Sequence, residues 1–190
     1  MPVNQSPIKP KLLLHVCCAP CSGFLHQSLK DCYEITVFYD NSNIDPLEEY
    51  VKRRDEAKKY FTDEGIGFIE KPYNHERWKT LAVGLEQELE RGRRCKRCYY
   101  ARLASVAEYA QTHGYAFFAT SLSISPHKDA KIINNLGRAL AHRYSLHFLA
   151  EDWKIDDGYK KATIFANQRG FYRQKYCGCE FSFRGGKKNE

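Results

Sequence analysis

The sequence has no long hydrophobic run and almost no methionine. Its apolar segments all fall short of the ~18 consecutive apolar residues that a membrane-spanning helix needs, and the N-terminal stretch MPVNQSPIKPK lacks the apolar centre of a signal peptide. No segment is a repeat or a linker rich in Gly, Pro or Ser. With 43% hydrophobic and 28% charged residues, the composition excludes disordered, collagen-like and coiled-coil chains. We expect one cytoplasmic domain over 11–184, a flexible N-terminus at 1–10 and a disordered tail at 185–190.

Basic residues and cysteines are in excess. Lys and Arg number 30 against 23 Asp and Glu, which gives a net charge of +7. Such a charge suits a polyanionic partner such as nucleic acid, although many basic proteins bind none. The chain also has eight cysteines and only one methionine. Because cytosolic thiols stay reduced, grouped cysteines in such a protein indicate metal or redox chemistry rather than structural disulfides.

Short apolar runs alternate with longer amphipathic or charged stretches. The apolar runs predict strands at 12–16, 35–39, 66–70, 115–120 and 147–149. The stretches between them predict helices at 22–30, 46–64, 75–90, 96–112, 128–143 and 158–169. This alternation predicts an α/β fold, with helices on both faces of a doubly wound, mainly parallel sheet. The mixed charges of 48–64 predict a solvated helix face.

Three of the predicted strands are followed by residues that can bind a ligand or take part in catalysis. Cys17, Cys18 and Cys21 follow the first strand, Asp40 and Asn41 follow the second, and the loop 121–127 follows the fourth. Ligands of open α/β sheets bind beyond the carboxyl ends of the strands, at the point where the strand order reverses. We therefore expect these loops to meet at one site, with the aromatic and basic tail from Phe171 onward lying against it.

Seven cysteines form three groups, namely Cys17, Cys18 and Cys21; Cys95 and Cys98; and Cys177 and Cys179. The spacing of Cys95 and Cys98 places both thiols on one helix face, where they can share a metal. Adjacent cysteines are awkward ligands for one tetrahedral zinc ion, whereas a larger cluster accommodates them. The spacing therefore favours a [4Fe–4S] cluster over zinc, with Cys17, Cys18, Cys95 and Cys98 as ligands.

The Cys177-Gly178-Cys179 sequence permits a tight disulfide ring, and strained disulfides are easily reduced. The neighbouring Arg173 and Lys175 are expected to favour the thiolate. One interpretation is a redox-active dithiol; the other is a further pair of metal ligands or two inert thiols. The remaining cysteine, Cys32, is expected to be a small buried hydrophobic residue.

Five blocks together resemble epoxyqueuosine reductases of the QueH type. They are LLLHVCCAPCSG at 12–23, FYDNSNIDPLEEYVKRRDEAKKY at 38–60, RCKRCYYARL at 94–103, ATSLSISPHKD at 119–129 and GYKKATIFANQRGFYRQKYCGCEFS at 158–182. The resemblance implies a fold similar to the adenine nucleotide α-hydrolase (HUP-like) fold. CCAPCSG stands where ATP pyrophosphatases of that fold carry a glycine-rich loop, and its few glycines argue against ATP use.

The resemblance also implies the reaction and its cofactors. Such enzymes reduce epoxyqueuosine in tRNA to queuosine with two electrons, without cobalamin, and depend on an electron donor that the sequence does not identify. The cluster ligands of the family match Cys17, Cys18, Cys95 and Cys98, and its redox-active disulfide matches Cys177 and Cys179. Cys21 stands where the family motif can carry an acidic residue, and could serve an additional iron ion beside the cluster.

Basic and aromatic residues gather in 91–102 and 169–175, a pattern typical of single-stranded RNA binding, although a solvated charged face has the same composition. With the resemblance, the pattern predicts tRNA or substrate contacts for Tyr39, Asn41, Arg97, Arg173 and Lys175. The proton donor is not identified among Tyr39, Asp40, His127 and Asp129. Two alternatives remain: a tRNA-binding module with a four-cysteine zinc site, and an ATP-dependent tRNA sulfurtransferase.

Overall fold

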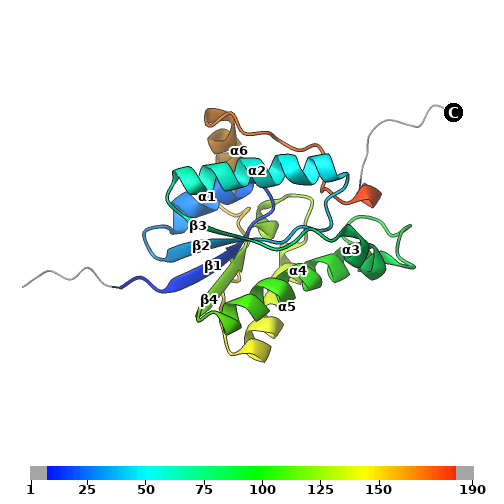
Figure 1. Cartoon of the computed structure of the whole chain (residues 1–190), viewed down its shortest axis with the longest axis horizontal. Helices are drawn as coiled ribbons and strands as arrows, with labels where there is room; N and C mark the ends of the chain where they lie inside the picture. Colours follow the sequence, from blue (N-terminus) through cyan, green and yellow to red (C-terminus); the bar gives the residue numbers. More distant parts are fainter. Residues whose placement is uncertain (1–7, 183–190) are drawn as a thin grey trace, which may run out of the picture.

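The computed structural model describes residues 8–182; the predicted disordered tail at 185–190 and most of the predicted flexible N-terminus lie outside the described residues. Five strands form one parallel sheet in the order β3-β2-β1-β4-β5 (Figure 1). They are β1 (Lys11–His15), β2 (Glu34–Tyr39), β3 (Gly67–Glu70), β4 (Phe117–Thr120) and β5 (His147–Phe148). Each lies within about two residues of its predicted position, and the predicted parallel sheet is confirmed.

Helices cover both faces of this sheet, so the predicted doubly wound α/β architecture is also confirmed. In Figure 1, α1 (Ala19–Leu29), α2 (Leu47–Asp63) and α6 (Gly158–Gln168) lie above the sheet, and α4 (Arg93–Thr112) and α5 (Ala130–Tyr144) lie below it. The short α3 (His75–Ala82) packs against α4. No helix among residues 8–182 is long and apolar enough to cross a membrane.

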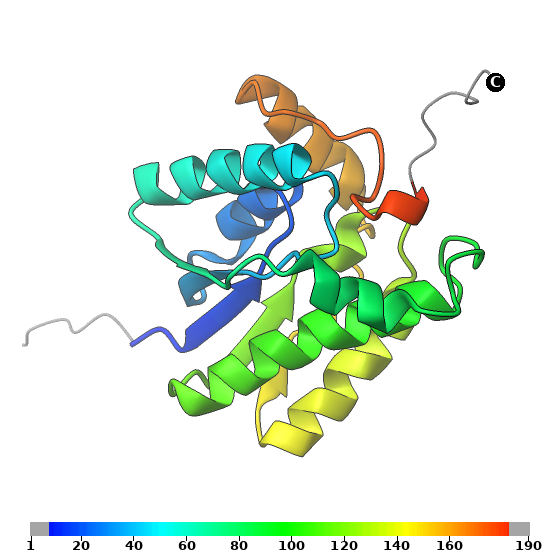
Figure 2. The same ribbon diagram turned by 45° about the vertical axis from the view of Figure 1, so that its right-hand side comes forward.

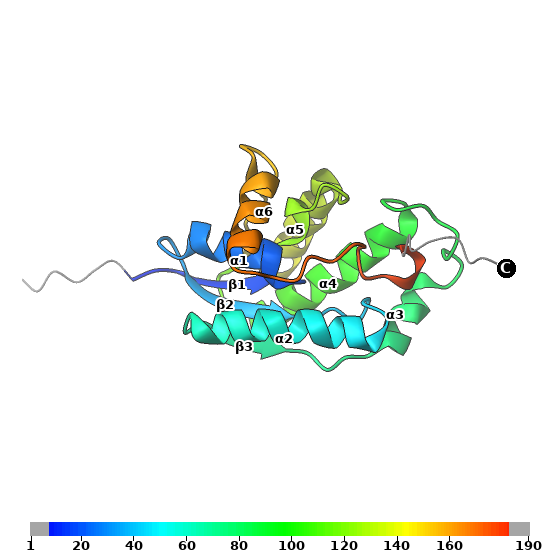
Figure 3. The same cartoon turned by 90° about the horizontal axis from the view of Figure 1, so that it is seen from above.

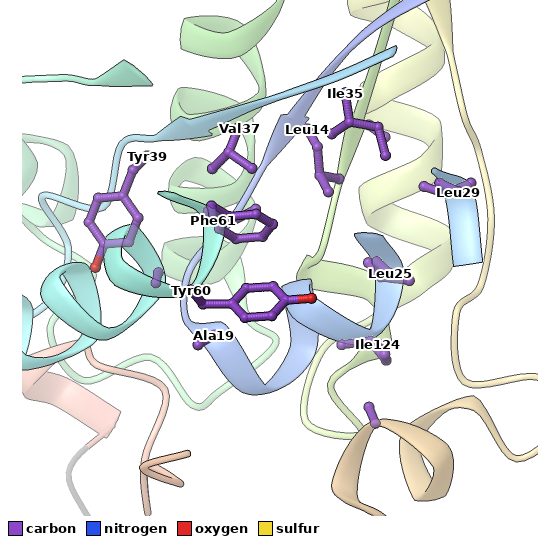
Figure 4. Packing of buried hydrophobic residues seen from close by; sticks show 14 of the residues in the cluster. Leu14, Ala19, Leu25, Leu29, Ile35, Val37, Tyr39, Tyr60, Phe61 and Ile124 are labelled. Atoms are coloured by element: carbon purple, nitrogen blue, oxygen red, sulfur yellow. The ribbon is translucent and has the colours of Figure 1, made fainter. Parts of the chain in front are cut away.

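Alternate side chains of β1 enter two separate apolar layers. Leu12 and Leu14 pack with α1 and α2, whereas Leu13 packs with α4 and α5. All three leucines have no exposed surface, and each such burial contributes about 1.5–3 kcal/mol. Figure 4 shows the first layer, where Phe61 and Leu25 face the sheet residues Leu14 and Val37. These two layers pack the faces of the sheet, and the polar residues described below lie at the carboxyl ends of its strands.

The helix boundaries differ from the predictions where local backbone chemistry intervenes. The predicted helix 75–90 ends at Ala82, because Val83 is extended and Gly84 has a φ of +73°, which is outside helical space. Helix α1 begins at Ala19 rather than at residue 22, with Pro20 in its first turn, where proline costs no hydrogen bond. The earlier start brings Cys18 to the N-cap of α1.

The strand order reverses between β1 and β4, so the loops after these two strands separate and open a site. The last described segment, 171–182, returns from α6 toward the carboxyl end of the sheet. It ends in a 3₁₀ turn, η2 (Glu180–Ser182), drawn in red in Figures 2 and 3. Phe181 of this turn packs on Trp78 of α3, with ring centroids 5.9 Å apart.

Candidate metal centre

The first cysteine group lies where β1 passes into α1. Cys18 is the N-cap of α1 and has 1% of its surface exposed, and its Sγ lies 3.8 Å from the Sγ of Cys17. The Sγ of Cys17 is also 3.8 Å from the Oγ of Ser121, which follows β4. The predicted meeting of the loops after the first and fourth strands is therefore present. Cys21 is half-buried in the first turns of α1.

The second group lies in the first turns of α4. Cys95 is half-buried and Cys98 is buried, and both line a small cavity of about 20 Å³ with Cys177 and Cys179. The cavity is closed by side chains that include Trp78 of α3. The CxxC pair and the C-terminal pair, which are about eighty positions apart in the sequence, therefore share one enclosure.

The segment 171–182 is tied to the site by several hydrogen bonds, which confirms the predicted course of the tail within this range. The guanidinium of Arg53 donates to the carbonyl oxygens of Tyr176 and Cys177, at 3.2 and 3.1 Å. The backbone NH of Asp45 donates to the carbonyl of Gly178 at 2.8 Å. The Nε2 of Gln174 lies 3.1 Å from the Sγ of Cys18.

A second cavity, of about 150 Å³, opens beside the first. Cys17, Cys21 and Cys177 line it together with His127 and Lys128. Cys177 borders both cavities and so lies between the first two cysteine groups. We refer to the two cavities, the six cysteines that line them and the adjacent Cys18 as the sulfur pocket. A larger hollow of about 680 Å³ is formed by residues 84–93 alone and contains none of these cysteines.

Two cations are buried beside the thiols. Arg102 is 5% exposed and donates to the Oδ1 of Asn41 and, at 3.4 Å, to the Nε2 of His15. Lys128 is 9% exposed, and among residues 8–182 no carboxylate lies within ion-pair distance of it. Burial lowers the pKa of Lys128, whereas Cys177 and Cys17 in their thiolate form would raise it above its usual value. The site therefore holds buried positive charge next to sulfur.

The local environment raises the pKa of several of these thiols, which favours their neutral form. A hydrogen bond with Cys18 and then burial raise the pKa of Cys17 well above its usual value. Burial raises the pKa of Cys95 and of Cys98. A metal that binds thiolates must displace these protons, and the thiolates formed would balance the charge of Arg102 and Lys128. The donor set and its charge environment thus fit a soft, thiolate-bound metal group.

Arg53, Arg102 and Lys128 were not identified as site residues from the sequence. The helix that carries Arg53 was predicted to be a solvated face, but Arg53 is 1% exposed and points at the C-terminal segment. Because acidic and basic residues alternate along this helix, the sequence did not show that Arg53 points inward. Arg102 and Arg94 lie in the stretch expected to touch RNA, yet both are buried. The three carbonyls of Leu85, Glu86 and Glu88 accept hydrogen bonds from Arg94.

The predicted polar contacts fall into two classes. Tyr39 and Asn41 are buried, at 0% and 1% exposure, so neither lies on a surface that RNA can reach. Asn41 instead connects the loop after β2 to the loop after β1, since its Nδ2 donates to the carbonyl of Val16 at 2.8 Å. By contrast, Arg97, Arg173 and Lys175 are exposed, as the predicted RNA contacts require.

The candidate proton donors are also distinguished by their surroundings. Burial raises the pKa of the Tyr39 hydroxyl, which has no hydrogen-bond partner among the described residues. Asp129 caps α5 by accepting from the NH of Ile132 at 3.0 Å, and Asp40 accepts from Ser105. His127 is exposed and lines the larger cavity of the sulfur pocket.

One cysteine expectation needs correction. Cys32 is exposed rather than buried, because it lies in the turn between α1 and β2. Arg173 and Lys175 are exposed, and Lys175 lines the same cavity as Cys177. The buried cations Arg102 and Lys128 also interact electrostatically with Cys177. Burial raises the pKa of Cys179 to about 12. Cys177 and Cys179 are both free thiols in this structure.

In comparisons with known proteins, the family model and the similar sequences carry the same description. A family model described as epoxyqueuosine reductase QueH matches residues 12–185. Epoxyqueuosine reductase QueH of Haemophilus influenzae is 39% identical over 180 residues, which cover 94% of this chain and 74% of that protein. The same-named protein of Staphylococcus aureus is 36% identical, covering 94% and 78%. That of Thermotoga maritima is 32% identical, covering 90% and 89%.

The fold also has a counterpart among solved structures. A crystal structure described as a predicted subunit of tRNA methyltransferase from Methanocaldococcus jannaschii aligns with a TM-score of 0.56. The alignment covers 82% of this chain and 74% of that one, at 14% sequence identity. At this identity the likeness shows a shared fold and carries no argument about the reaction.

Proposed function

Because the chain belongs to the epoxyqueuosine reductase QueH family, we propose that it reduces epoxyqueuosine in tRNA to queuosine, the last step of this modification. The observation that carries the proposal is the 39% identity to a QueH protein over 94% of the chain. The sulfur pocket supports it, because a reductive deoxygenation needs redox-active groups next to the substrate.

The electron balance of the reaction assigns a role to the C-terminal cysteine pair. Removing the epoxide oxygen breaks two C–O bonds, forms a C=C bond and releases water, which takes two electrons and two protons. Oxidation of the thiols of Cys177 and Cys179 to a disulfide releases two electrons and two protons. The pair can therefore supply one turnover, after which an external electron donor returns the disulfide to the dithiol.

We assign Cys17, Cys18, Cys95 and Cys98 as ligands of a [4Fe–4S] cluster. Such a cluster would supply one-electron transfer, and an additional iron ion with an open coordination position would supply a Lewis acid. The support is the donor set of four soft thiols beside the buried charges of Arg102 and Lys128. Cys21 lines the same cavity as Cys17, which is consistent with an additional iron ion there.

Other side chains of the sulfur pocket can act on the substrate directly. Lys128 lies in the larger cavity as a buried cation, where it would stabilise negative charge that develops on the epoxide oxygen. His127 borders the same cavity and is exposed, so it can take a proton from water and pass it to the leaving oxygen. Tyr39 is fully buried, so its hydroxyl is not placed to donate a proton to the substrate.

The surface around the larger cavity suits an RNA loop. Arg173 and Lys175 are exposed; Arg173 lies beside Tyr159, and Lys175 itself lines the cavity. Tyr159 stands at the same cavity with 39% of its surface exposed. An exposed aromatic ring next to cations can stack on an unpaired base while the cations hold phosphates. We propose that the modified nucleotide enters the site past Tyr159.

An anaerobic preparation tests this assignment. The protein should be brown, absorb broadly near ~400 nm and contain about four iron ions per chain. With a chemical reductant it should convert epoxyqueuosine in tRNA to queuosine, as measured by nucleoside mass spectrometry. A colourless protein that holds about one zinc ion and binds tRNA without converting it would contradict the proposal and support the zinc-containing RNA-binding module instead.

A further inference from the structure

Three oxygen and nitrogen ligands meet outside the sulfur pocket. Asp45 comes from the loop after β2, His75 is the first residue of α3, and Glu180 is the first residue of η2. The Nε2 of His75 lies 3.5 Å from the Oδ1 of Asp45 and 3.4 Å from the Oε1 of Glu180. All three ligand atoms lie within 4.8 Å of one another. We call these residues the carboxylate–histidine site.

The imidazole of His75 is held in one orientation. Its Nδ1 donates to the carbonyl of Ser42 at 2.9 Å, which directs the Nε2 toward the two carboxylates. The ring stacks between Tyr73 and Trp78, at interplanar angles of 8° and 18°. A backbone carbonyl on one ring nitrogen is the arrangement that fixes metal-binding histidines and leaves the other nitrogen available.

Two of the ligand atoms are buried without a partner. The His75 side chain is only 10% exposed, and its Nε2 and the Oε1 of Glu180 make no hydrogen bond with any described residue. A buried polar atom left in this way costs about 1–3 kcal/mol. Within residues 8–182 no lysine or arginine lies within ion-pair distance of either carboxylate.

The spacing distinguishes a metal site from a protonated histidine. Charge-assisted hydrogen bonds between an imidazolium and a carboxylate are about 2.7–2.9 Å long. The observed separations of 3.4 and 3.5 Å are longer. They match the edges of a tetrahedral zinc site, about 3.3–3.5 Å for metal–ligand distances of about 2.0–2.1 Å. Two carboxylates and a neutral imidazole would also balance the charge of a divalent cation.

We propose that Asp45, His75 and Glu180 bind a divalent transition-metal ion of the zinc type, separate from the thiols and independent of the proposed function. The ion would fasten the C-terminal segment to the body of the protein. Asp45 already holds this segment through its NH and the carbonyl of Gly178, and the metal would add Glu180 to the same anchor. Cys179 lies directly before Glu180, so the ion would fix its position from outside.

The test uses the cluster-containing protein and zinc as the probe. The anaerobic holoprotein is incubated with a slight excess of Zn²⁺, gel-filtered and analysed for zinc and iron. The wild type should retain about one zinc ion per chain with an X-ray absorption spectrum of nitrogen and oxygen ligands at about 2.0–2.1 Å. His75→Gln should lower the zinc affinity at least tenfold and leave the iron content unchanged. His142→Gln, at an exposed position of α5, is the matched control.

Glu180→Gln is the second variant, since it keeps the shape of the side chain and guards against a folding defect in His75→Gln. It should also lower the zinc affinity at least tenfold, and Zn²⁺ should raise the melting temperature of the wild type but of neither variant. Equal zinc retention in the wild type and both variants would overturn the proposal. A sulfur shell near ~2.3 Å would do the same, because it would place the zinc on the thiols.

Discussion

The sulfur pocket and the carboxylate–histidine site lie at opposite ends of one short stretch, Cys177 to Glu180, and their charge environments are opposite. The first has soft thiols beside the buried cations Arg102 and Lys128. The second has two carboxylates around one imidazole, with no lysine or arginine of residues 8–182 within ion-pair distance of them. Buried cations favour an anionic group such as a cluster on thiolates, whereas unpaired carboxylates favour a cation. The surroundings of the ligands therefore distinguish the two sites as clearly as the ligands do.

The largest expected effect is loss of the cluster. Cys17→Ala, Cys18→Ala, Cys95→Ala or Cys98→Ala should each reduce the iron content from about four ions per chain to near zero and abolish turnover. Cys32→Ala is the matched control, because this cysteine is exposed and lines neither cavity of the sulfur pocket. Iron analysis and the absorption spectrum of the anaerobic protein measure the effect. Full iron content in any of the four variants would remove that residue from the ligand set.

The C-terminal pair should behave differently. Cys177→Ser and Cys179→Ser are expected to keep most of the iron but to stop turnover, because the serine variants cannot form the disulfide that stores two electrons. Thiol counting under denaturing, non-reducing conditions should find two fewer free thiols in the oxidised wild type than in the reduced protein. Iron loss in either variant would instead make that cysteine a cluster ligand. This alternative is worth testing because Cys177 and Cys179 line the same cavity as Cys95 and Cys98.

Gly178 gives a related test that retains both thiols. Its φ of +110° is strained for any side chain, and a Cβ here would lie 2.9 Å from Ile44 and 3.0 Å from Arg53. Gly178→Val should therefore displace the segment and lower the rate of disulfide formation at least tenfold. The rate is measured by mass spectrometry after oxidant is added to the reduced protein. An unchanged rate would show that the observed backbone conformation is not needed for pairing.

A smaller effect is expected from the charge of Lys128. Lys128→Met removes a buried cation and keeps a side chain of similar length, so reduction of the cluster becomes less favourable. The cluster potential should fall by on the order of 50 mV, the size of one partly screened charge interaction. Protein-film voltammetry measures the shift, with Lys131→Met, exposed one position into α5, as control. A potential that does not move would place the cluster away from Lys128.

The smallest effect concerns the RNA surface. Arg97→Gln or Arg173→Gln should weaken tRNA binding, and each should flatten the dependence of log affinity on log salt by about one unit for every phosphate group that the variant no longer neutralises. Arg138→Gln, which is also exposed but lies in the middle of α5, should leave the slope unchanged. Equal slopes in all the proteins would place the RNA on another surface.

The sequence predicted the sheet well because the strands carry their own signal. Leu12, Leu13 and Leu14 form a continuous apolar run, as expected for a strand covered on both faces. The meeting of the loops after β1 and β4 also followed, since the carboxyl ends of parallel strands lie at one edge. Cys17 and Ser121, which are far apart in the sequence, are accordingly in contact.

The buried charges could not be predicted in this way. Arg53 and Arg102 look like their solvated neighbours, and only the packing of the C-terminal segment and of α4 shows that they point inward. The carboxylate–histidine site was missed for the same reason. Its ligands come from three segments with no motif in common, and Asp45 and Glu180 lie 135 positions apart. The only local signal was the position of His75 directly after the helix cap Asn74.

The most direct test of the central claim is a single-turnover reaction without an added reductant. The anaerobic protein is first reduced, freed of reductant, and mixed with excess tRNA from cells blocked at epoxyqueuosine. Nucleoside mass spectrometry should find about one queuosine per protein chain, and less than about a tenth of that with Cys177→Ser. Equal yields from the wild type and Cys177→Ser, or no queuosine from the iron-loaded wild type, would contradict the account.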